Sequence, residues 1–313
     1  MKKAFLYGLA ASFFFSFTFI LNRQMNLQGG HWIWSGVLRY AFMLPMLFVL
    51  LLPKKEAAPV WQDIKKRPLP WILWSTVGFG LFYAPMCFAS VYSPSWLVAA
   101  AWQITLVAGA LLSPLFYTIE EGPQGSVKKR QKIPGKALFF SSFVLLGIIV
   151  IQLTTEAHGG TTFLGGLLAI LPVVVGAFAY PLGNRKMMAV CDNRFNTLQR
   201  VFGMTLCSMP FWALLSVVGL VQAGPPNGNQ IFQSLLVAIF SGVAATLLFF
   251  KATDMVSRDI HKLAVVESTQ AGEILFTLLG GVLLFKDQPP SLPAFIGIAL
   301  VMGGMILNSY SAR

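Results

Sequence analysis

The chain is a succession of long apolar segments joined by short polar ones. Segments such as 138–153 and 234–250 contain no charged residue and show no alternation of polar and apolar positions. The strands of a membrane barrel would alternate over about ten residues, so this pattern favours helices. Allowing about 20 residues for each crossing, the sequence predicts ten transmembrane helices at 4–22, 31–53, 70–90, 95–117, 137–153, 163–182, 197–221, 231–250, 263–285 and 293–309.

The composition agrees with a chain surrounded by lipid. Apolar residues occupy 56% of the 313 positions and charged residues only 11%, whereas soluble domains carry roughly 25% charged residues. A chain in lipid must satisfy its backbone hydrogen bonds internally, which again favours helices. The first apolar segment has the charge and apolar core of a signal sequence, but residues 22–25 offer no small-residue cleavage site. We therefore expect it to remain as the first helix.

The positions of the positive charges predict the orientation. Of the 23 Lys and Arg residues, 19 fall on the side of the N-terminus, 2 on the opposite side and 2 within predicted spans. Short cytoplasmic loops retain such residues, so both termini are predicted to be cytoplasmic in a bacterial inner membrane. The basic segments 54–67 and 128–136 are interpreted as retention signals that contact lipid headgroups. They lack the interleaved aromatic residues of a single-strand platform, so no nucleic-acid partner is expected.

The chain also contains an internal repeat. Asn-Arg pairs lie near the ends of the first and sixth spans, an arginine follows each pair after 15 or 16 residues, and segments 96–103 and 263–270 align without gaps so that a glutamine recurs at the same depth. Three matches in the same order indicate duplication. The matched residues are Asn22 and Asn184, Arg23 and Arg185, Arg39 and Arg200, and Gln103 and Gln270.

The number of spans in each half sets the symmetry of the repeat. Because five is odd, the second half must enter the membrane from the opposite side, and inverted repeats of this kind are typical of transporters. The sequence thus predicts an all-α integral membrane protein with one membrane domain, in which residues 1–155 and 160–313 form two inverted five-helix repeats. A duplication that merely enlarged a structural protein is the alternative.

Five segments carry a resemblance to a known family. They are 19–23, 32–40, 96–105, 267–273 and the glycine-rich 297–304. In these segments the chain resembles the ten-helix branch of the drug/metabolite transporter superfamily, and more specifically the bacterial multidrug resistance efflux transporters. The resemblance spans essentially the whole chain and implies transport, but it leaves the solute open, because the superfamily handles amino acids, sugars, nucleotide precursors and drugs. Four-helix relatives carry an essential glutamate in the first helix, whereas residues 4–21 contain no acid.

Glu267 and Glu273 are the only acids inside predicted spans, and both lie on the ninth. An ionisable group inside a membrane is costly, so it should face an interior cavity and is a functional candidate. With Gln270 the two acids form one polar helix face. Glu273 is predicted to bind a proton or a cationic or amine-bearing solute; an ion pair with Arg39 or Arg200, or a hydrogen bond to Gln103, is the alternative. Glu267 lies near the cytoplasmic end and could instead extend to water.

Other residues complete the candidate site. Arg39 lies deep in the second span, where it could hold an anionic group, neutralise a glutamate or extend to the outer interface. Gln103 and Gln270 would meet if the fourth and ninth helices pack centrally, and they suit either solute recognition or bonding between helices. Trp102, Tyr83 and Tyr180 could form aromatic walls for a cation. Glu120 and Asp287 follow matching spans and are interpreted as structural caps.

Together these features predict a secondary active transporter that exports small lipophilic or cationic compounds or metabolites, with the proton gradient as driving force and no cofactor. An amino-acid or other metabolite permease is the alternative, and a lipid-carrier flippase or a non-transporting membrane scaffold is the alternative from another class. We see no paired acids with protease spacing, metal motif or nucleophile beside a base, so neither an enzyme nor a metal site is expected. The expected partners are a small-molecule solute and membrane lipid, with a monomer or a homodimer as the assembly.

Overall fold

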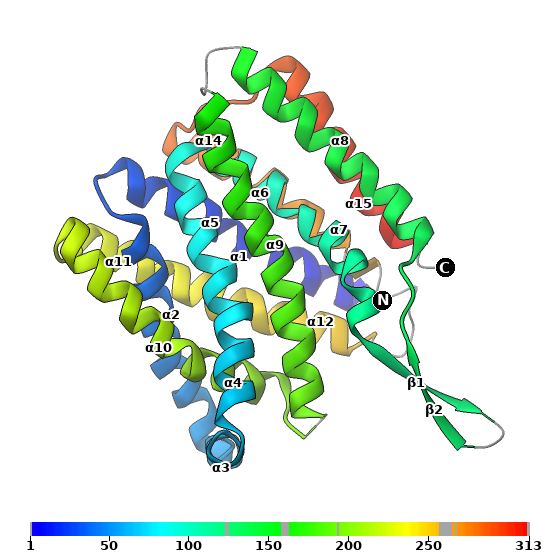
Figure 1. Ribbon diagram of the computed structural model, residues 1–313. Coiled ribbons are helices and arrows are strands. Elements are labelled where there is room, and N and C mark those ends of the chain that lie inside the picture. The colour runs from blue at the N-terminus through cyan, green and yellow to red at the C-terminus, as the bar shows by residue number, and fades with distance from the viewer. Residues whose placement is uncertain are drawn as a thin grey trace.

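The computed structural model describes residues 2–122, 125–157, 163–192, 194–256, 265–266 and 268–311. This part of the chain is almost entirely helical (Figure 1), with one two-stranded sheet. Seven of the helical segments it describes are long and apolar enough to cross a membrane: Lys2–Leu27, Trp32–Lys54, Pro68–Tyr92, Gly165–Cys191, Thr197–Ala223, Gly228–Thr253 and Leu292–Ser309. Three shorter apolar helices, Ser95–Leu111, Leu138–Thr154 and Thr269–Phe285, occupy the positions of the fourth, fifth and ninth predicted spans.

The elements follow one another as helices with brief interruptions. The first part of the chain forms α1 (Lys2–Leu27), α2 (Trp32–Leu51), η1 (Leu52–Lys54), α3 (Ala57–Lys66), α4 (Pro68–Ser75), η2 (Thr76–Gly80), α5 (Leu81–Tyr92), α6 (Ser95–Trp102), α7 (Ile104–Leu111), η3 (Ser113–Leu115), β1 (Tyr117–Gly122), β2 (Gly125–Arg130) and α8 (Gly135–Ala157). The second part forms α9 (Phe163–Cys191), α10 (Thr197–Ala223), α11 (Gly228–Val237), η4 (Ala238–Ala245), α12 (Thr246–Asp254), η5 (Thr269–Ala271), α14 (Gly272–Phe285) and α15 (Leu292–Ser311).

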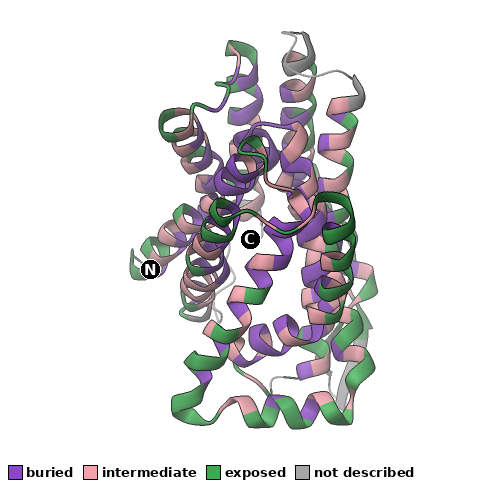
Figure 2. Ribbon diagram, turned by 90° about the vertical axis from the view of Figure 1, so that its left-hand side faces the viewer, coloured by how far each residue is buried: buried purple, intermediate pink, exposed green. Residues whose placement is uncertain are grey.

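Large apolar side chains cover the outside of the helices. Leu69, Val221 and Leu292 are 78%, 83% and 86% exposed, and Figure 2 shows exposed residues along the outward sides of helices whose inner sides are buried. Soluble monomers rarely expose extended apolar surface, because water disfavours it. Together with the apolar helices, this surface defines a multi-pass membrane protein.

Helices from distant parts of the chain pack side by side. α1 packs against α12 and α14, and α9 packs against α5, α6 and α7. α2 lies against α10, and α8 lies against α15 along one edge of the bundle (Figure 1). Each of these contacts joins the first part of the chain to the second, so the two parts interleave in a single helical body.

Glycine allows the closest of these approaches. A Cβ atom on Gly183 of α9 would lie 2.3 Å from the Cα and N atoms of Gly78 in η2. A Cβ atom on Gly147 of α8 would lie 2.5 Å from the carbonyl oxygen of Gly297 in α15. Backbone atoms cannot move aside as a flexible side chain can, so these helices are in contact only because both positions lack a side chain.

Four of the helical segments are interrupted inside the bundle, at η2, at η4, at Gln103 and at the 3₁₀ turn η5. η2 and η4 are π-helical turns, and both lie within segments predicted as continuous spans. The helix 95–111 breaks at Gln103, whose side chain Nε2 donates to the Ala99 carbonyl oxygen at 3.2 Å. That oxygen would otherwise accept from the Gln103 backbone, which bonds to Ala100 instead. The side chain thus competes with the helical ladder.

The connecting segments hold more structure than the hydropathy pattern predicts. Segment 54–67 was predicted as a basic loop, but most of it forms the short helix α3, which buries Val60 and Asp63 on one side. Segment 128–136 includes part of β2, which pairs antiparallel with β1 from Tyr117 opposite Arg130 to Gly122 opposite Gly125. The fourth span was predicted to reach residue 117, whereas α7 ends at Leu111.

Candidate functional site

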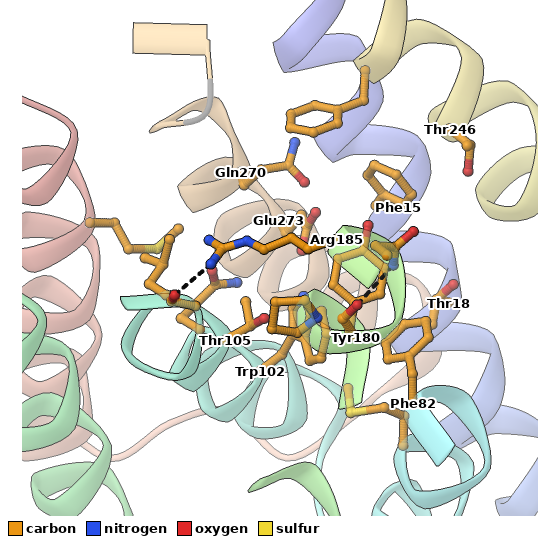
Figure 3. A pocket seen from close by; sticks show the side chains of 18 of the residues that line it. Phe15, Thr18, Phe82, Trp102, Thr105, Tyr180, Arg185, Thr246, Gln270 and Glu273 are labelled. Carbon is orange, nitrogen blue, oxygen red and sulfur yellow. Dashed lines mark hydrogen bonds between the residues drawn. The ribbon is translucent and has the colours of Figure 1, made fainter. Parts of the chain in front are cut away.

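A cavity of about 890 Å³ lies among the helices. Side chains from α1, α2, α5, α6, α7, α8, α9, α10, α12, α14 and α15 contribute to its wall, together with Gln103 and residues of the short turns η2, η3, η4 and η5. Figure 3 shows a part of this wall. Ligand pockets for small molecules typically measure about 300–1,000 Å³. The cavity therefore has the size of a small-molecule site.

Six of the seven residues predicted for the site line this cavity. They come from four different helical segments and are separated by up to 234 positions along the chain: Arg39, Tyr83, Trp102, Gln103, Gln270 and Glu273. Glu267, the seventh, lies outside the described residues. The structure therefore places six of the residues predicted from the sequence around one cavity.

Glu273 lies in the first turn of α14 and is only 3% exposed. Its side chain lines the cavity, as does that of Gln103, with which a hydrogen bond was predicted as one alternative. Among the described residues the ion pairs are those of Asp63 with Arg67 and Arg194, so neither Arg39 nor Arg200 pairs with Glu273 there. Figure 3 shows Gln270 and Glu273 on neighbouring turns of the same segment.

Arg39 is buried inside the bundle, with 6% of its surface exposed. Its Nη1 donates to Thr18 Oγ1 at 3.0 Å, and its Nη2 donates to Ser241 Oγ at 3.3 Å. The guanidinium carbon lies 4.1 Å from the centroid of the Tyr83 ring. Of the alternatives predicted for Arg39, extension to the outer interface does not occur in this structure.

Three aromatic rings form one wall of the cavity. Phe82 lies 4.9 Å from Trp102 and 4.8 Å from Tyr180, and Trp102 lies 5.5 Å from Tyr180, measured between ring centroids. Figure 3 shows the three side chains together. Trp102 and Tyr180 were predicted as wall residues, but Phe82 was not. Nothing in the sequence separates it from the other 26 phenylalanines, since the chain contains 27.

The cavity reaches toward the side predicted to be cytoplasmic. Lys136, Arg185 and Ser309 line that part of it, and Arg185 Nη1 donates to the Gly109 carbonyl oxygen at 2.8 Å. Lys136 lies at the start of α8, at the end of the basic segment 128–136, and Arg185 and Ser309 lie in the C-terminal parts of α9 and α15. The cavity can therefore communicate with that side of the membrane.

The opposite side is held together by polar contacts. Asp287 Oδ2 accepts from the backbone nitrogen and the hydroxyl of Ser95, both at 2.7 Å, at the start of α6. Arg23 Nη1 donates to the carbonyl oxygens of Ser90 and Val91 at 3.1 and 2.7 Å, at the end of α5. Asp287 is thus a structural cap, as predicted, although it caps α6 and not its own helix. The side chain of Glu120, its predicted counterpart, lies outside the described residues.

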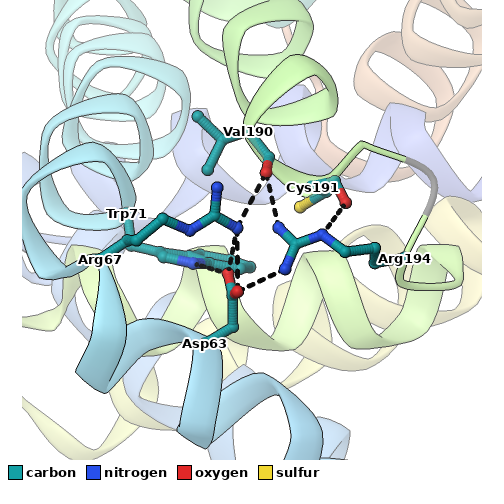
Figure 4. A network of polar contacts seen from close by, with 6 residues as sticks. All are labelled: Asp63, Arg67, Trp71, Val190, Cys191 and Arg194. Atoms are coloured by element: carbon teal, nitrogen blue, oxygen red, sulfur yellow. Dashed lines mark hydrogen bonds and ion pairs between the residues drawn. The ribbon is translucent and has the colours of Figure 1, made fainter.

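A separate polar network lies away from the cavity, at the end of α9 (Figure 4). Asp63 accepts from Arg67 at 2.9 Å, from Arg194 at 2.6 Å and from the indole nitrogen of Trp71 at 2.9 Å. Both arginines also donate to the carbonyl oxygen of Val190, at 3.2 and 2.9 Å. This network closes the end of α9 against α3 and α4, so it is part of the scaffold.

Comparison with known proteins places the chain among membrane transport proteins. Residues 2–313 match the family described as "EmrE: Putative multidrug resistance efflux transporter". The chain is 48% identical over 312 residues to "Uncharacterized protein YjlA" of Bacillus subtilis (strain 168), covering 99% of this chain and 95% of that protein. It is also 48% identical over 274 residues to an "Uncharacterized 42.1 kDa protein" of Shouchella clausii, covering 87% and 70% of the two chains.

The fold recurs in a protein known from a crystal structure. The two chains align with a TM-score of 0.66 over 99% of this chain and 97% of the other, at 16% sequence identity. The fold and the cavity define the class, a multi-pass membrane protein with a small-molecule chamber between its helices. Within that class the chain belongs to the EmrE family of multidrug resistance efflux transporters.

Proposed function

We propose that the protein is a secondary active transporter that moves small amine-bearing or cationic organic compounds or metabolites out of a bacterial cell in exchange for protons. The observation that carries the proposal is the position of Glu273, a buried carboxyl group facing a central cavity whose wall is built from both parts of the chain. Acids inside membrane spans are rare because they are costly, and they commonly mark ion or solute pathways.

The packing supports two inverted five-helix repeats within this transporter. The repeat pairs α1 with α9, α2 with α10, α5 with α12, α6 and α7 with α14, and α8 with α15. When each helix is exchanged for its counterpart, the contact of α1 with α12 becomes the contact of α9 with α5. The contact of α1 with α14 becomes that of α9 with α6 and α7, and the pairs α2–α10 and α8–α15 map onto themselves. Such an exchange symmetry is expected when two copies face opposite sides of the membrane.

The helix interruptions follow the same exchange. The π-helical turns η2 and η4 lie in the third and eighth predicted spans, which are counterparts. Gln103 and Gln270, which the repeat aligns, lie at a break and in the 3₁₀ turn η5 of their own helices. Discontinuous helices in matching positions of two halves are a feature of solute sites in inverted-repeat transporters.

The proposed mechanism is competition for one carboxyl group. A cationic amine and a proton cannot both occupy Glu273, so binding of the solute releases the proton and binding of the proton releases the solute. The wall of Phe82, Trp102 and Tyr180 would hold the apolar body and favour a cation near its ring faces. Exchange across the membrane then requires the cavity to open alternately to each side.

The conformation of the structure has the features expected of the inward-open state of a transport cycle. The cavity extends to Lys136 and Arg185 on the side predicted to be cytoplasmic, while Asp287 and Arg23 hold the opposite ends of the helices together. Opening to the outside would require these contacts to separate. Hinge motions of one repeat against the other are the usual form of this change.

Transport by purified protein in liposomes tests the proposal. With an acidic lumen, we expect wild-type protein to accumulate tetraphenylphosphonium or phenethylamine above the level in protein-free vesicles, and to dissipate the pH gradient as it does so. Glu273→Gln should abolish both effects. Asp192→Asn, an acid-to-amide change at an exposed position, serves as the control and should behave as wild type. Transport of neither probe nor of an amine-bearing metabolite such as phenylalanine, or equal accumulation by Glu273→Gln, would show the proposal to be wrong.

The alternatives lead to different results in the same vesicles. A permease for amino acids or other metabolites would move its solute without dissipating a pH gradient. A lipid-carrier flippase would move labelled lipid between leaflets, and a scaffold would move nothing. Light scattering coupled to size-exclusion chromatography would measure the molar mass of the protein and so distinguish a monomer from a homodimer.

A further inference from the structure

The buried guanidinium of Arg39 has no acidic partner among the described residues. The ion pairs found there both involve Asp63, in the network at the end of α9. A charge taken out of water is strongly destabilising unless an opposite charge or a set of good hydrogen bonds compensates it. Within the described part of the chain, only neutral neighbours stabilise the charge of Arg39.

These neighbours do not accept a hydrogen bond from every nitrogen of the guanidinium. Thr18 and Ser241 accept from the two Nη atoms, and the hydroxyl of Thr18 itself donates to Ser241. The Tyr83 ring lies against the guanidinium, and the Tyr83 hydroxyl bonds to Asn22. Arg39 Nε has no hydrogen-bond partner in the described part of the chain. The side chain lines the cavity, so a solute can reach it.

We propose that Arg39 binds an anionic group of the transported solute, and that the solute is an amphoteric compound carrying a carboxylate together with an amine. This inference rests on the proposed transport function and narrows its substrate class. The planar guanidinium matches a carboxylate in shape and charge. Glu273 binds the amine, and the wall of Phe82, Trp102 and Tyr180 binds an aromatic or apolar body.

The charge balance of the cavity favours this class over a simple lipophilic cation. Arg39 is always protonated, so a solute bearing only positive charge would enter a chamber that already contains an uncompensated cation. A solute with both charges compensates Arg39 with its carboxylate while its amine replaces the proton on Glu273. Both buried groups then have partners at the same time, which neither a pure cation nor a pure anion provides.

Three probes that share one ring and one chain length test the inference. Phenylalanine carries both charges, phenethylamine carries only the amine, and 3-phenylpropionate carries only the carboxylate. Ligand-induced thermal stabilisation of the purified full-length protein should give phenylalanine an affinity at least about tenfold higher than either of the others, as expected for a charge-assisted contact. Arg39→Gln should remove the advantage of phenylalanine over phenethylamine, and Arg39→Lys, which retains the charge, should restore part of it.

Arg200→Gln is the matched control. Arg200 is the counterpart of Arg39 in the repeat, but it lies 5.7 Å from the Phe250 ring and is not among the cavity residues. This variant should keep the wild-type order of affinities. The melting temperature of each variant without ligand shows whether it folds.

Several outcomes would overturn the inference. They are equal binding of phenethylamine and phenylalanine by wild type, an unchanged preference in Arg39→Gln, and stabilisation by none of the three probes. If phenethylamine alone exchanges for protons in liposomes, the transport function stands and the amphoteric class is wrong. If no probe exchanges for protons and Glu273→Gln has no effect, the transport function itself is wrong.

Discussion

Among the described residues, the buried charged side chains divide into those that join helices, Asp63 and Asp287, and those that line the cavity, Arg39 and Glu273. Asp63 is compensated by two arginines and an indole nitrogen, whereas Arg39 and Glu273 lie in the cavity without an oppositely charged partner among the described residues. Compensated charges hold helices in place, while an uncompensated buried charge lowers stability. The two settings therefore separate residues that build the scaffold from residues available to a solute.

The scaffold role of Asp63 can be measured directly. Asp63→Asn keeps the shape of the side chain but removes its charge, so both arginines lose their ionic partner. Because the arginine side chains are 41% and 44% exposed, water compensates part of the loss, and we expect destabilisation of about 1–3 kcal/mol. Thermal unfolding in detergent should show a lower melting temperature than wild type.

The exposed Asp192 provides the control for this change. Asp192→Asn is the same substitution on the same side of the bundle, outside the network, and should leave the melting temperature unchanged. Equal effects of the two substitutions would contradict the structural role given to Asp63.

Residues of the candidate site could be predicted from the sequence where their residue type is rare in apolar spans or where the repeat aligns them. Glu273 and Arg39 stand out because acids and arginines are scarce in apolar spans, and Gln103 and Gln270 stand out because the repeat aligns them. Thr18, Ser241 and Phe82 also shape the cavity, but hydroxyl and phenylalanine residues are common in these spans. Only the folded arrangement distinguishes them from residues that face lipid or a neighbouring helix.

At the scale of elements, hydropathy predicts the apolar centres of helices better than their ends. The first and sixth spans were predicted to end at residues 22 and 182, whereas α1 continues to Leu27 and α9 to Cys191. Polar residues continue these helices because they find partners there; Arg23, for example, donates to carbonyl oxygens at the end of α5. Helix α3 was not predicted, because its charged residues make the segment polar overall, although one side of the helix buries Val60 and Asp63.

A substitution at Gly183 tests the close contact between α9 and η2. Gly183→Ala would place a Cβ atom 2.3 Å from backbone atoms of Gly78, and α9 would have to move away from η2. Overpacking of this kind costs about 1–3 kcal/mol, so the melting temperature should fall. Because η2 and α5 carry cavity residues, binding of a probe should weaken as well.

Gly303→Ala is the matched control in another helix. A Cβ atom there would have nothing within 4 Å, and alanine has the higher helix propensity at both positions. The control should be as stable as wild type or slightly more stable. A melting temperature of Gly183→Ala equal to that of the control would refute the close contact between α9 and η2.

At the scale of the whole molecule, the order of matching residues along the sequence was more informative than any one motif. The repeat predicts which spans correspond, and the exchange of packing pairs is consistent with it. The membrane orientation remains a prediction from the distribution of Lys and Arg. The precise shape of the cavity was not predictable, since it depends on which sides of eleven helices meet.

Cysteine labelling in intact cells tests the orientation. Lys66 and Gln222 are exposed, and the three native cysteines are buried, so introduced cysteines should be the sites that react. A membrane-impermeant maleimide should label Gln222→Cys in intact cells, but Lys66→Cys only after the cells are permeabilised. The reverse pattern would overturn the assignment of both termini to the cytoplasm.

In the proposed cycle, Glu273 gives up a proton when the cavity takes up a solute. The most direct measurement follows proton release from purified protein in weakly buffered solution as phenylalanine or phenethylamine is added. Wild type should release about one proton for each bound probe, by linkage between the two ligands, and Glu273→Gln should release none. Binding without proton release by wild type, or undiminished release by Glu273→Gln, would contradict this cycle.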